Sequence, residues 1–138
     1  MSVFVDTSAF FAVAVEQAAG HDRFTQVLAA DDVAPVTTTA VLTELWGLMR
    51  ARFDRTAGDR LIGALLRGAV HVEPVGPGDL LRAMEIGEEF PDQPFSLVDR
   101  TSFAVMHRLG LHRVATLDHH FAVYRFGPGR RKAFEVAY

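Results

Sequence analysis

Four carboxylates occupy positions from which a cation site could form. They are Asp6, Glu44, Asp99 and Asp118. Two of them, Asp6 and Asp118, each follow an apolar segment with the character of a short strand. Because clustered carboxylates repel one another, such groups usually surround one or two Mg²⁺ or Mn²⁺ ions, which take oxygen ligands and bind substrate phosphates. A metal held there could activate water for in-line attack on a phosphodiester.

Three of these carboxylates also have a purely structural interpretation. Aspartate is common where a strand leads into a helix, so Asp6 and Asp118 could each cap a helix. Asp99 stands three residues after Ser96, the spacing of a capping box, in which the side chain reaches back to the N-cap amide. It also lies in line with Phe103, four residues on, and so points toward the core side of its helix. A cap and a metal ligand are compatible roles for one side chain.

Glu44 is informative because of its apolar neighbours. Val41, Leu45 and Leu48 form an inward stripe at i, i+4 and i+7, and Glu44 is expected to share that face. Burying an unpaired carboxylate costs several kcal/mol, so Glu44 would need a cation, a partner or an opening to solvent. The alternative is a salt bridge to an arginine or a position at the edge of the apolar face.

Short apolar segments alternate with helical patterns along the whole chain. We expect strands at 2–5, 33–36, 69–75, 113–117 and 133–138, and helices at 8–14, 21–30, 39–53, 55–67, 80–87 and 96–108. This rhythm predicts one α/β domain over residues 1–138, with a central, mostly parallel sheet in a three-layer α/β/α arrangement. In such open sheets ligands bind beyond the carboxyl ends of the strands, where Asp6 and Asp118 are expected.

The composition excludes several classes of protein. The 138 residues include 14 basic and 17 acidic side chains, which gives a net charge of −3, and there is no cysteine. Disulfides, thiolate zinc sites and cysteine nucleophiles are therefore absent. The longest apolar run, Ala9 to Val15, is too short to span a bilayer, so we expect a cytoplasmic protein with no membrane partner.

The motifs around the four carboxylates resemble those of a known family. The matching stretches are Val5-Asp6-Thr7-Ser8-Ala9, Thr43-Glu44-Leu45, Phe95-Ser96-Leu97-Val98-Asp99 with Ser102-Phe103-Ala104-Val105-Met106, and Ala115-Thr116-Leu117-Asp118 with Phe121. Their order and their spread over nearly the whole chain resemble the PIN-domain ribonucleases, and within them the VapC toxins of type II toxin–antitoxin pairs.

The resemblance implies a function and a role for each matching residue. Asp6, Glu44, Asp99 and Asp118 would be the catalytic acids of a metal-dependent endoribonuclease, and Asp6, Asp99 and Asp118 would hold Mg²⁺ or Mn²⁺. Ser8 and Thr116 would orient carboxylates through their hydroxyl groups. RNA would be the substrate, a cognate antitoxin the protein partner, and a homodimer the oligomeric state.

The chain departs from the family pattern at one position. Some relatives carry an acidic residue two places after the last aspartate, where this chain has His120, and this leaves a second metal position open. The pair His119-His120 could provide metal ligands or an acid–base pair, but surface histidines beside a helix start are the commoner case. Six arginines could contact RNA phosphates or simply form solvated faces: Arg50, Arg52, Arg55, Arg125, Arg130 and Arg131.

Two other functions remain open from the sequence. An aspartyl-nucleophile phosphatase also begins with an aspartate after its first strand, but it needs a second acid where this chain has Ser8, and a lysine, of which the chain has only Lys132. A non-catalytic RNA- or protein-binding module is the second alternative. The retention of all four acids counts against it, because negative charge in a cleft repels a polyanion.

Overall fold

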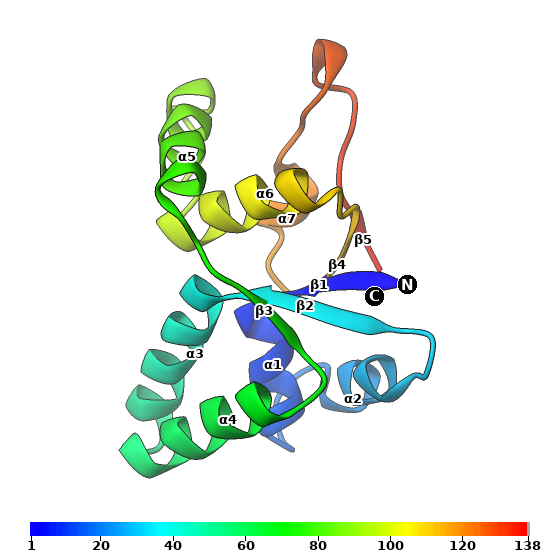
Figure 1. Ribbon diagram of the computed structural model, residues 1–138, viewed down its shortest axis with the longest axis vertical. Coiled ribbons are helices and arrows are strands. Elements are labelled where there is room, and N and C mark those ends of the chain that lie inside the picture. Colours follow the sequence, from blue (N-terminus) through cyan, green and yellow to red (C-terminus); the bar gives the residue numbers. More distant parts are fainter. Residues whose placement is uncertain (138) are drawn as a thin grey trace.

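Five short parallel strands form a central sheet. The computed structural model describes residues 1–137 (Figure 1). The strands are β1 Ser2–Val5, β2 Ala34–Thr38, β3 His71–Glu73, β4 Arg113–Ala115 and β5 Glu135–Val136. They lie in the order β3-β2-β1-β4-β5, and each neighbouring pair is parallel. The predicted α/β class with a mostly parallel sheet is therefore confirmed.

Helices cover both faces of this sheet. They are α1 Thr7–Ala14, α2 His21–Ala29, α3 Thr39–Arg52, α4 Arg55–Arg67, α5 Pro77–Glu89, α6 Leu97–Leu109 and α7 His120–Val123, with a short 3₁₀ turn at Pro128–Arg130. Figure 1 shows α1 to α4 on one side of the sheet and α5 to α7 on the other. This arrangement is the expected three-layer α/β/α architecture.

The central strand β1 is fixed on both sides, and this places Asp6. Val3, Phe4 and Val5 are completely buried, as a middle strand of a parallel sheet must be when helices cover both faces. Val5 is in register with Ala115 of β4, and the Asp6 amide donates to the Ala115 carbonyl at 3.1 Å. Asp6 and the residues that follow β4 therefore leave the sheet side by side at its carboxyl edge.

Several predicted boundaries were wrong, for local reasons. The first helix was expected over residues 8–14, but Asp6 is its N-cap and Thr7 is already helical. The next helix was expected over residues 80–87, but Gly76 is the N-cap of α5 and Pro77 its first residue, a position that tolerates the missing amide proton of proline. Asp79, in the first turn of α5, accepts a hydrogen bond from the Gly76 amide at 3.0 Å.

Three of the strands, β3, β4 and β5, are shorter than predicted. β3 was expected over 69–75 and β4 over 113–117, but only three residues of each are strand. The last strand was expected over 133–138, whereas Glu135–Val136 forms it and Tyr138 lies outside the described residues. α7 was not predicted as an element. In residues 1–137, no helix combines the length and the apolar character that crossing a bilayer requires.

Candidate active site

Asp6 is held by the backbone of two elements at once. Its amide belongs to the sheet, while its carbonyl accepts from the Phe10 amide at 3.2 Å and so begins α1. The side chain makes no capping hydrogen bond to the helix. It is 4% exposed and faces the carboxyl end of β4. The capping interpretation of Asp6 therefore applies to its backbone only, and the carboxylate is available for chemistry.

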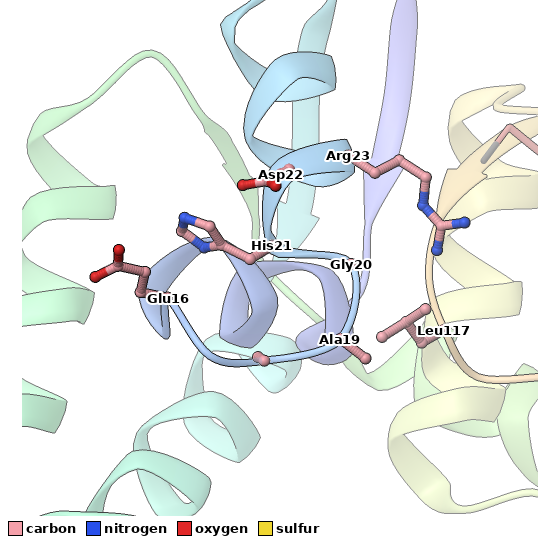
Figure 2. Close-up of a pocket in the computed structure, with 8 residues that line it drawn as sticks. Glu16, Ala19, Gly20, His21, Asp22, Arg23 and Leu117 are labelled. Carbon is pink, nitrogen blue, oxygen red and sulfur yellow. The ribbon is translucent and has the colours of Figure 1, made fainter.

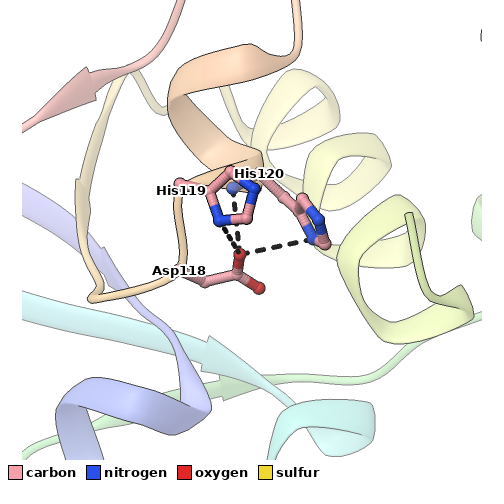
Figure 3. Close-up of side chains that lie close together, drawn as sticks. All are labelled: Asp118, His119 and His120. Carbon is pink, nitrogen blue, oxygen red and sulfur yellow. Dashed lines mark hydrogen bonds and ion pairs between the residues drawn. The ribbon is translucent and has the colours of Figure 1, made fainter. Parts of the chain in front are cut away.

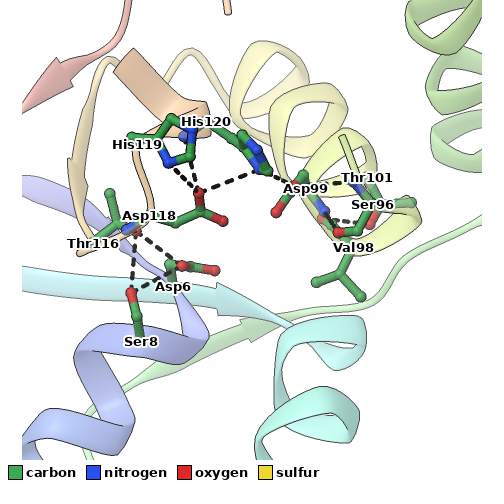
Figure 4. A network of polar contacts seen from close by, with 10 residues as sticks. All are labelled: Asp6, Ser8, Ser96, Val98, Asp99, Thr101, Thr116, Asp118, His119 and His120. Atoms are coloured by element: carbon green, nitrogen blue, oxygen red, sulfur yellow. Dashed lines mark hydrogen bonds and ion pairs between the residues drawn. The ribbon is translucent and has the colours of Figure 1, made fainter. Parts of the chain in front are cut away.

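Two hydroxyl groups fix the orientation of the Asp6 carboxylate. Ser8 Oγ donates to Asp6 Oδ2 at 3.1 Å, and Thr116 Oγ1 donates to the same oxygen at 2.9 Å. Each hydroxyl in turn accepts from a backbone amide, Ser8 from Leu117 at 2.9 Å and Thr116 from Asp118 at 2.8 Å. Because the amides occupy hydroxyl lone pairs, the hydroxyl protons are directed toward Asp6. Figure 4 shows this network.

Asp99 closes the first turn of α6 and also faces the site. Ser96 Oγ accepts from the Asp99 amide and Asp99 Oδ2 accepts from the Ser96 amide, both at 3.0 Å, which is the predicted capping box. The same Oδ2 atom lies 2.8 Å from His120 Nδ1. The carboxylate is 7% exposed, so it is both a structural cap and a member of the polar cluster.

Asp118 links the strand end to α7. Its Oδ1 atom accepts from the His120 amide at 2.9 Å and lies 3.3 Å from His120 Nδ1. His119 and not Asp118 is the N-cap of α7, so the predicted cap position was wrong, although the Asp118 carboxylate accepts from the amide of the first helical residue. The ligand atoms of Asp118, His119 and His120 all lie within 4.8 Å of one another, a spacing that could hold a metal ion (Figure 3).

The three aspartates act on one another electrostatically. Burial is the main reason that the pKa of Asp6 rises to about 6, and the charge of Asp118 raises it further against the opposing hydrogen bonds from Thr116 and Ser8. Burial also raises the pKa of Asp99, again assisted by the Asp118 charge and opposed by the hydrogen bonds from Ser96 and His120. Two buried carboxylates and a third between them form a site in which added positive charge is favourable.

His120 belongs to the site, contrary to our interpretation of the histidine pair as surface residues. Its side chain is 17% exposed, and its ring packs edge-on against Phe95 with centroids 5.4 Å apart. His119 is 79% exposed and lies 3.9 Å from Asp118 Oδ1, so the surface interpretation holds for this neighbour. The available signal was the position of His120 two residues after Asp118, where some relatives carry an acid.

Glu44 is not buried, although Val41 and Leu45 of the predicted inward stripe are. The buried residues of α3 are Val41, Leu42, Leu45 and Met49, while Leu48 is only partly covered. At about 100° per residue, the centre of this face lies roughly a third of a turn away from Glu44, which is exposed. Within residues 1–137, no hydrogen bond or ion pair joins Glu44 to the three aspartates.

A separate cavity of about 430 Å³ lies beyond Leu117, between the loop after α1 and the start of α2. Its charged side chains are Glu16, Asp22 and Arg23, and Figure 2 shows Glu16 and Arg23 directed to opposite sides. His21 is engaged with the Ala12 carbonyl at 2.7 Å. Because the charged groups of this cavity do not converge, the aspartate cluster remains the candidate active site.

The donor set of the aspartate cluster fits a divalent cation. Carboxylate oxygens from Asp6, Asp99 and Asp118 are the ligands that Mg²⁺ and Mn²⁺ prefer. Across the described part of the chain, no arginine or lysine forms an ion pair with any of these carboxylates. The basic side chains paired with these carboxylates in the described residues are His119 and His120, so no permanently charged side chain compensates the cluster as it would in a structural salt bridge.

The carboxylate motifs and the fold match a known family over most of the chain. A model of the PIN domain matches residues 3–127. The chain belongs to the PIN-domain family. This confirms the predicted family, and the PIN domain of this chain is VapC-like. This chain is 30% identical over 124 residues to the 23S rRNA-specific endonuclease VapC20 of two Mycobacterium tuberculosis strains. The aligned residues cover 90% of this chain and 95% of VapC20.

Solved structures show the same likeness. The crystal structure of Mycobacterium tuberculosis VapC20, described as a sarcin-ricin loop cleaving toxin, matches with a TM-score of 0.81 and 29% identity over 88% of this chain and 93% of that one. VapBC2 from Rickettsia felis, bound to a promoter DNA fragment, matches with a TM-score of 0.67 over 89% and 92% of the two chains. At 10% identity, the second match shows a shared fold alone.

Proposed function

We propose that this chain is one PIN-like nuclease domain over residues 1–138 that hydrolyses RNA phosphodiester bonds with the help of Mg²⁺ or Mn²⁺. The observation that carries this proposal is the convergence of Asp6, Asp99 and Asp118 at the carboxyl edge of the sheet with no arginine or lysine paired to them in the described residues. These three side chains would hold the metal. The chemistry that such an ion supplies is activation of water for in-line attack and neutralisation of charge on the leaving oxygen.

The residues around the carboxylates position them for this task. Ser8 and Thr116 hold Asp6 through Oδ2, and the Ser96 amide holds Asp99 through the capping box. Hydrogen bonds of this kind fix the orientation of a ligating carboxylate. Glu44 remains assigned as a catalytic acid by resemblance alone. Its exposed side chain extends from α3, which begins where β2 ends, at the same edge of the sheet as Asp6.

The relatives supply the biological context of the proposal. VapC20 cleaves 23S rRNA, so 23S rRNA is the first substrate to test for this chain. A VapC-like toxin implies a cognate antitoxin, and we propose that such a protein inhibits this one inside the cell. We also propose a homodimer. The exposed apolar side chains of Leu81 and Met84 on α5 support it, and sedimentation velocity would test it.

A basic hairpin near the site offers contacts for RNA phosphates. Phe126 and Lys132 pair as an antiparallel bridge, and the exposed arginines Arg125, Arg130 and Arg131 lie in or beside the turn. The Arg130 guanidinium carbon lies 4.6 Å from the centroid of the Phe90 ring. The ring centroids of Phe90 and Phe95 are 5.8 Å apart, and those of Phe95 and His120 are 5.4 Å apart. These packed side chains connect the hairpin to His120, so an RNA strand of a few nucleotides bound at the site could also contact the hairpin.

The two alternative functions have less support. An aspartyl-nucleophile phosphatase would need an acid at position 8, but Ser8 is a hydroxyl that orients Asp6, and Lys132 lies in the hairpin. A non-catalytic binding module would gain nothing from three carboxylates that have no arginine or lysine partner in its cleft. A non-catalytic module also predicts that Mn²⁺ does not raise the melting temperature.

The experiment that tests the proposal compares wild type with Asp99→Asn. We expect Mg²⁺- or Mn²⁺-dependent cleavage of 23S rRNA by wild type, none in chelator, and at least a hundredfold loss in the variant. Metal at about a hundred times its dissociation constant stabilises the native state by about 2.7 kcal/mol, so wild type should melt several degrees higher with Mn²⁺ than with chelator. Asp99→Asn should lose most of that shift.

A matched control separates the metal role of Asp99 from its capping role. Asp54 caps α4 by accepting from the Ala57 amide at 2.8 Å and is exposed. Asp54→Asn removes the same charge from a helix start and should keep both cleavage and the Mn²⁺ shift. If Asp99→Asn melts lower in chelator yet retains the full Mn²⁺ shift, Asp99 is a cap only. Cleavage that persists equally in chelator would refute the metal mechanism.

A further inference from the structure

His120 Nδ1 is the point at which two carboxylates of the site meet. It lies 2.8 Å from Asp99 Oδ2 and 3.3 Å from Asp118 Oδ1, one on either side of the ring nitrogen (Figure 4). The ring is held in place from two directions. The Phe95 ring packs edge-on against it, and the His120 amide is bonded to Asp118 Oδ1 at 2.9 Å at the start of α7. The imidazole is therefore oriented before any ligand binds.

These separations are those of neighbouring ligands around one metal ion. Adjacent ligands of an octahedral ion with bonds of about 2.1 Å lie about 3.0 Å apart. Adjacent ligands of a tetrahedral ion with bonds of that length lie about 3.4 Å apart. The two observed distances fall in this interval or just below it. Asp118 Oδ1 and His120 Nδ1 could thus share a cation, and Asp99 Oδ2 lies close to the same nitrogen.

We propose that His120 Nδ1 is a metal ligand, and that the site consequently prefers a first-row transition-metal ion such as Mn²⁺ to Mg²⁺. Mg²⁺ takes oxygen ligands almost exclusively, whereas imidazole nitrogen suits the softer transition metals. A site of two carboxylates and one imidazole therefore discriminates between ions that an all-carboxylate site binds in a similar way. This inference rests on the proposed metal-dependent function and specifies which cation serves it.

A different role for His120 would also explain the contacts. The imidazole could be a positioning residue that orients Asp99 through a hydrogen bond and never touches the metal. An asparagine at position 120 separates the two roles, because its side-chain amide can still donate a hydrogen bond to Asp99 but offers no imidazole nitrogen. His119→Gln is the companion variant, because His119 is the adjacent histidine and belongs to the same group of ligand atoms, 3.9 Å from Asp118 Oδ1. Nitrogen coupling that survives in His119→Gln does not come from His119.

The test is pulsed electron paramagnetic resonance of one equivalent of Mn²⁺ bound to the purified protein. Wild type should show the nitrogen coupling of a directly bound imidazole, and so should His119→Gln. His120→Asn and His120→Asp should both lose this coupling. The ratio of the Mg²⁺ dissociation constant to that of Mn²⁺, measured by calorimetry, should fall on the order of tenfold in His120→Asp, which replaces the nitrogen donor with oxygen.

The outcomes distinguish this inference from the proposed function. Mn²⁺ that binds wild type without nitrogen coupling would show that His120 is not a ligand, while the proposed metal-dependent function would survive. Coupling that persists in His120→Asn would assign the ligand to another histidine and overturn the inference in the same way. If folded wild type binds neither ion at millimolar concentration, both proposals fail. Because two different substitutions at position 120 are used, a folding defect in one leaves the other as the test.

Discussion

Asp6 retains its proton to a higher pH than an exposed aspartate does. Desolvation raises its pKa to about 6 because the carboxylate loses water that Ser8 and Thr116 replace only in part. The neighbouring charge of Asp118 acts in the same direction. In the metal-free protein the ionised form of Asp6 is therefore disfavoured relative to the unfolded chain, where the pKa is near 3.8.

This shift predicts a pH dependence of stability with a definite sign. Between pH 4 and pH 6 the native state holds a proton on Asp6 that the unfolded state has released, so the stabilisation is present below about pH 4 and is lost as the pH rises through 6. The change amounts to about 3 kcal/mol. Asp6→Asn lacks it. Urea unfolding of both proteins in chelator, from pH 4 to pH 7, measures the difference between them.

The comparison with Asp6→Asn isolates this residue from other titrating groups. Asp79, for example, has a lowered pKa because Arg108 is hydrogen-bonded to it, and its contribution has the opposite sign. It is common to both proteins and cancels in the difference. Wild type should be the less stable of the two at pH 7. Parallel stability curves for the two proteins across this range would count against a raised pKa of Asp6.

At the residue scale, the sequence predicted those site features whose signal is local. The Ser96 and Asp99 capping box spans three residues and is present, and the hydroxyls of Ser8 and Thr116, assigned by resemblance, do contact Asp6. The role of His120 could not be derived from periodicity. Its contact with Asp99, 21 positions earlier, exists only because the sheet brings the end of β4 beside the start of α6.

At the scale of elements, α5, α6 and β3 are joined by one ion-pair network. Arg108 near the end of α6 donates to both oxygens of Asp79 on α5, at 2.9 and 3.0 Å, and to Glu73 on β3 at 2.7 Å. Asp79 Oδ2 also accepts from the Gly76 amide at 3.0 Å. A bidentate contact between a largely buried carboxylate and an arginine is stronger than an exposed surface pair.

The network should therefore matter for stability but not for metal binding. Asp79→Ala removes the partner of Arg108 and the hydrogen bond from the Gly76 amide at the start of α5. It should therefore lower the free energy of unfolding by about 1–3 kcal/mol. The Mn²⁺-induced rise in melting temperature should remain, because no contact of the network reaches the aspartate cluster. Chemical denaturation and thermal melts measure the two effects. Asp92→Ala, in an exposed loop, is the control and should change neither. A lost Mn²⁺ shift in Asp79→Ala would link the network to the active site.

The elements themselves were largely predictable, and the errors have a common physical origin. Periodicity located six helices and five strands, because apolar spacing reflects one buried face. Periodicity did not locate those ends of helices and strands that tertiary contacts determine. β3 stops where its three pairings with β2 stop, at Val36, Thr37 and Thr38. α7 is a single turn that Asp118 initiates through the His120 amide, and it is too short to have a periodic pattern.

At the scale of the whole molecule, positive charge gathers on the hairpin at residues 125–132 and not among the carboxylates themselves. The chain has a net charge of −3, yet the hairpin at residues 125–132 carries four basic side chains and no acidic ones. None of the four forms an ion pair within residues 1–137, and all are exposed. The negative net charge of the chain therefore conceals a local patch with the opposite sign.

This patch predicts how RNA binding depends on salt. Arg131 and Lys132 have no hydrogen-bond acceptor for their side chains in the described structure, so the variant Arg131→Gln/Lys132→Gln should fold normally. If both residues contact phosphates, the variant should raise KM for RNA, leave kcat nearly unchanged, and reduce the slope of log affinity against log salt by about 0.7 for each lost contact with a single strand. Arg60→Gln/Arg67→Gln removes the same charge from exposed positions on α4 and is the matched control. Equal effects of the two double variants on the salt slope would mean that net charge, rather than the hairpin, attracts the RNA.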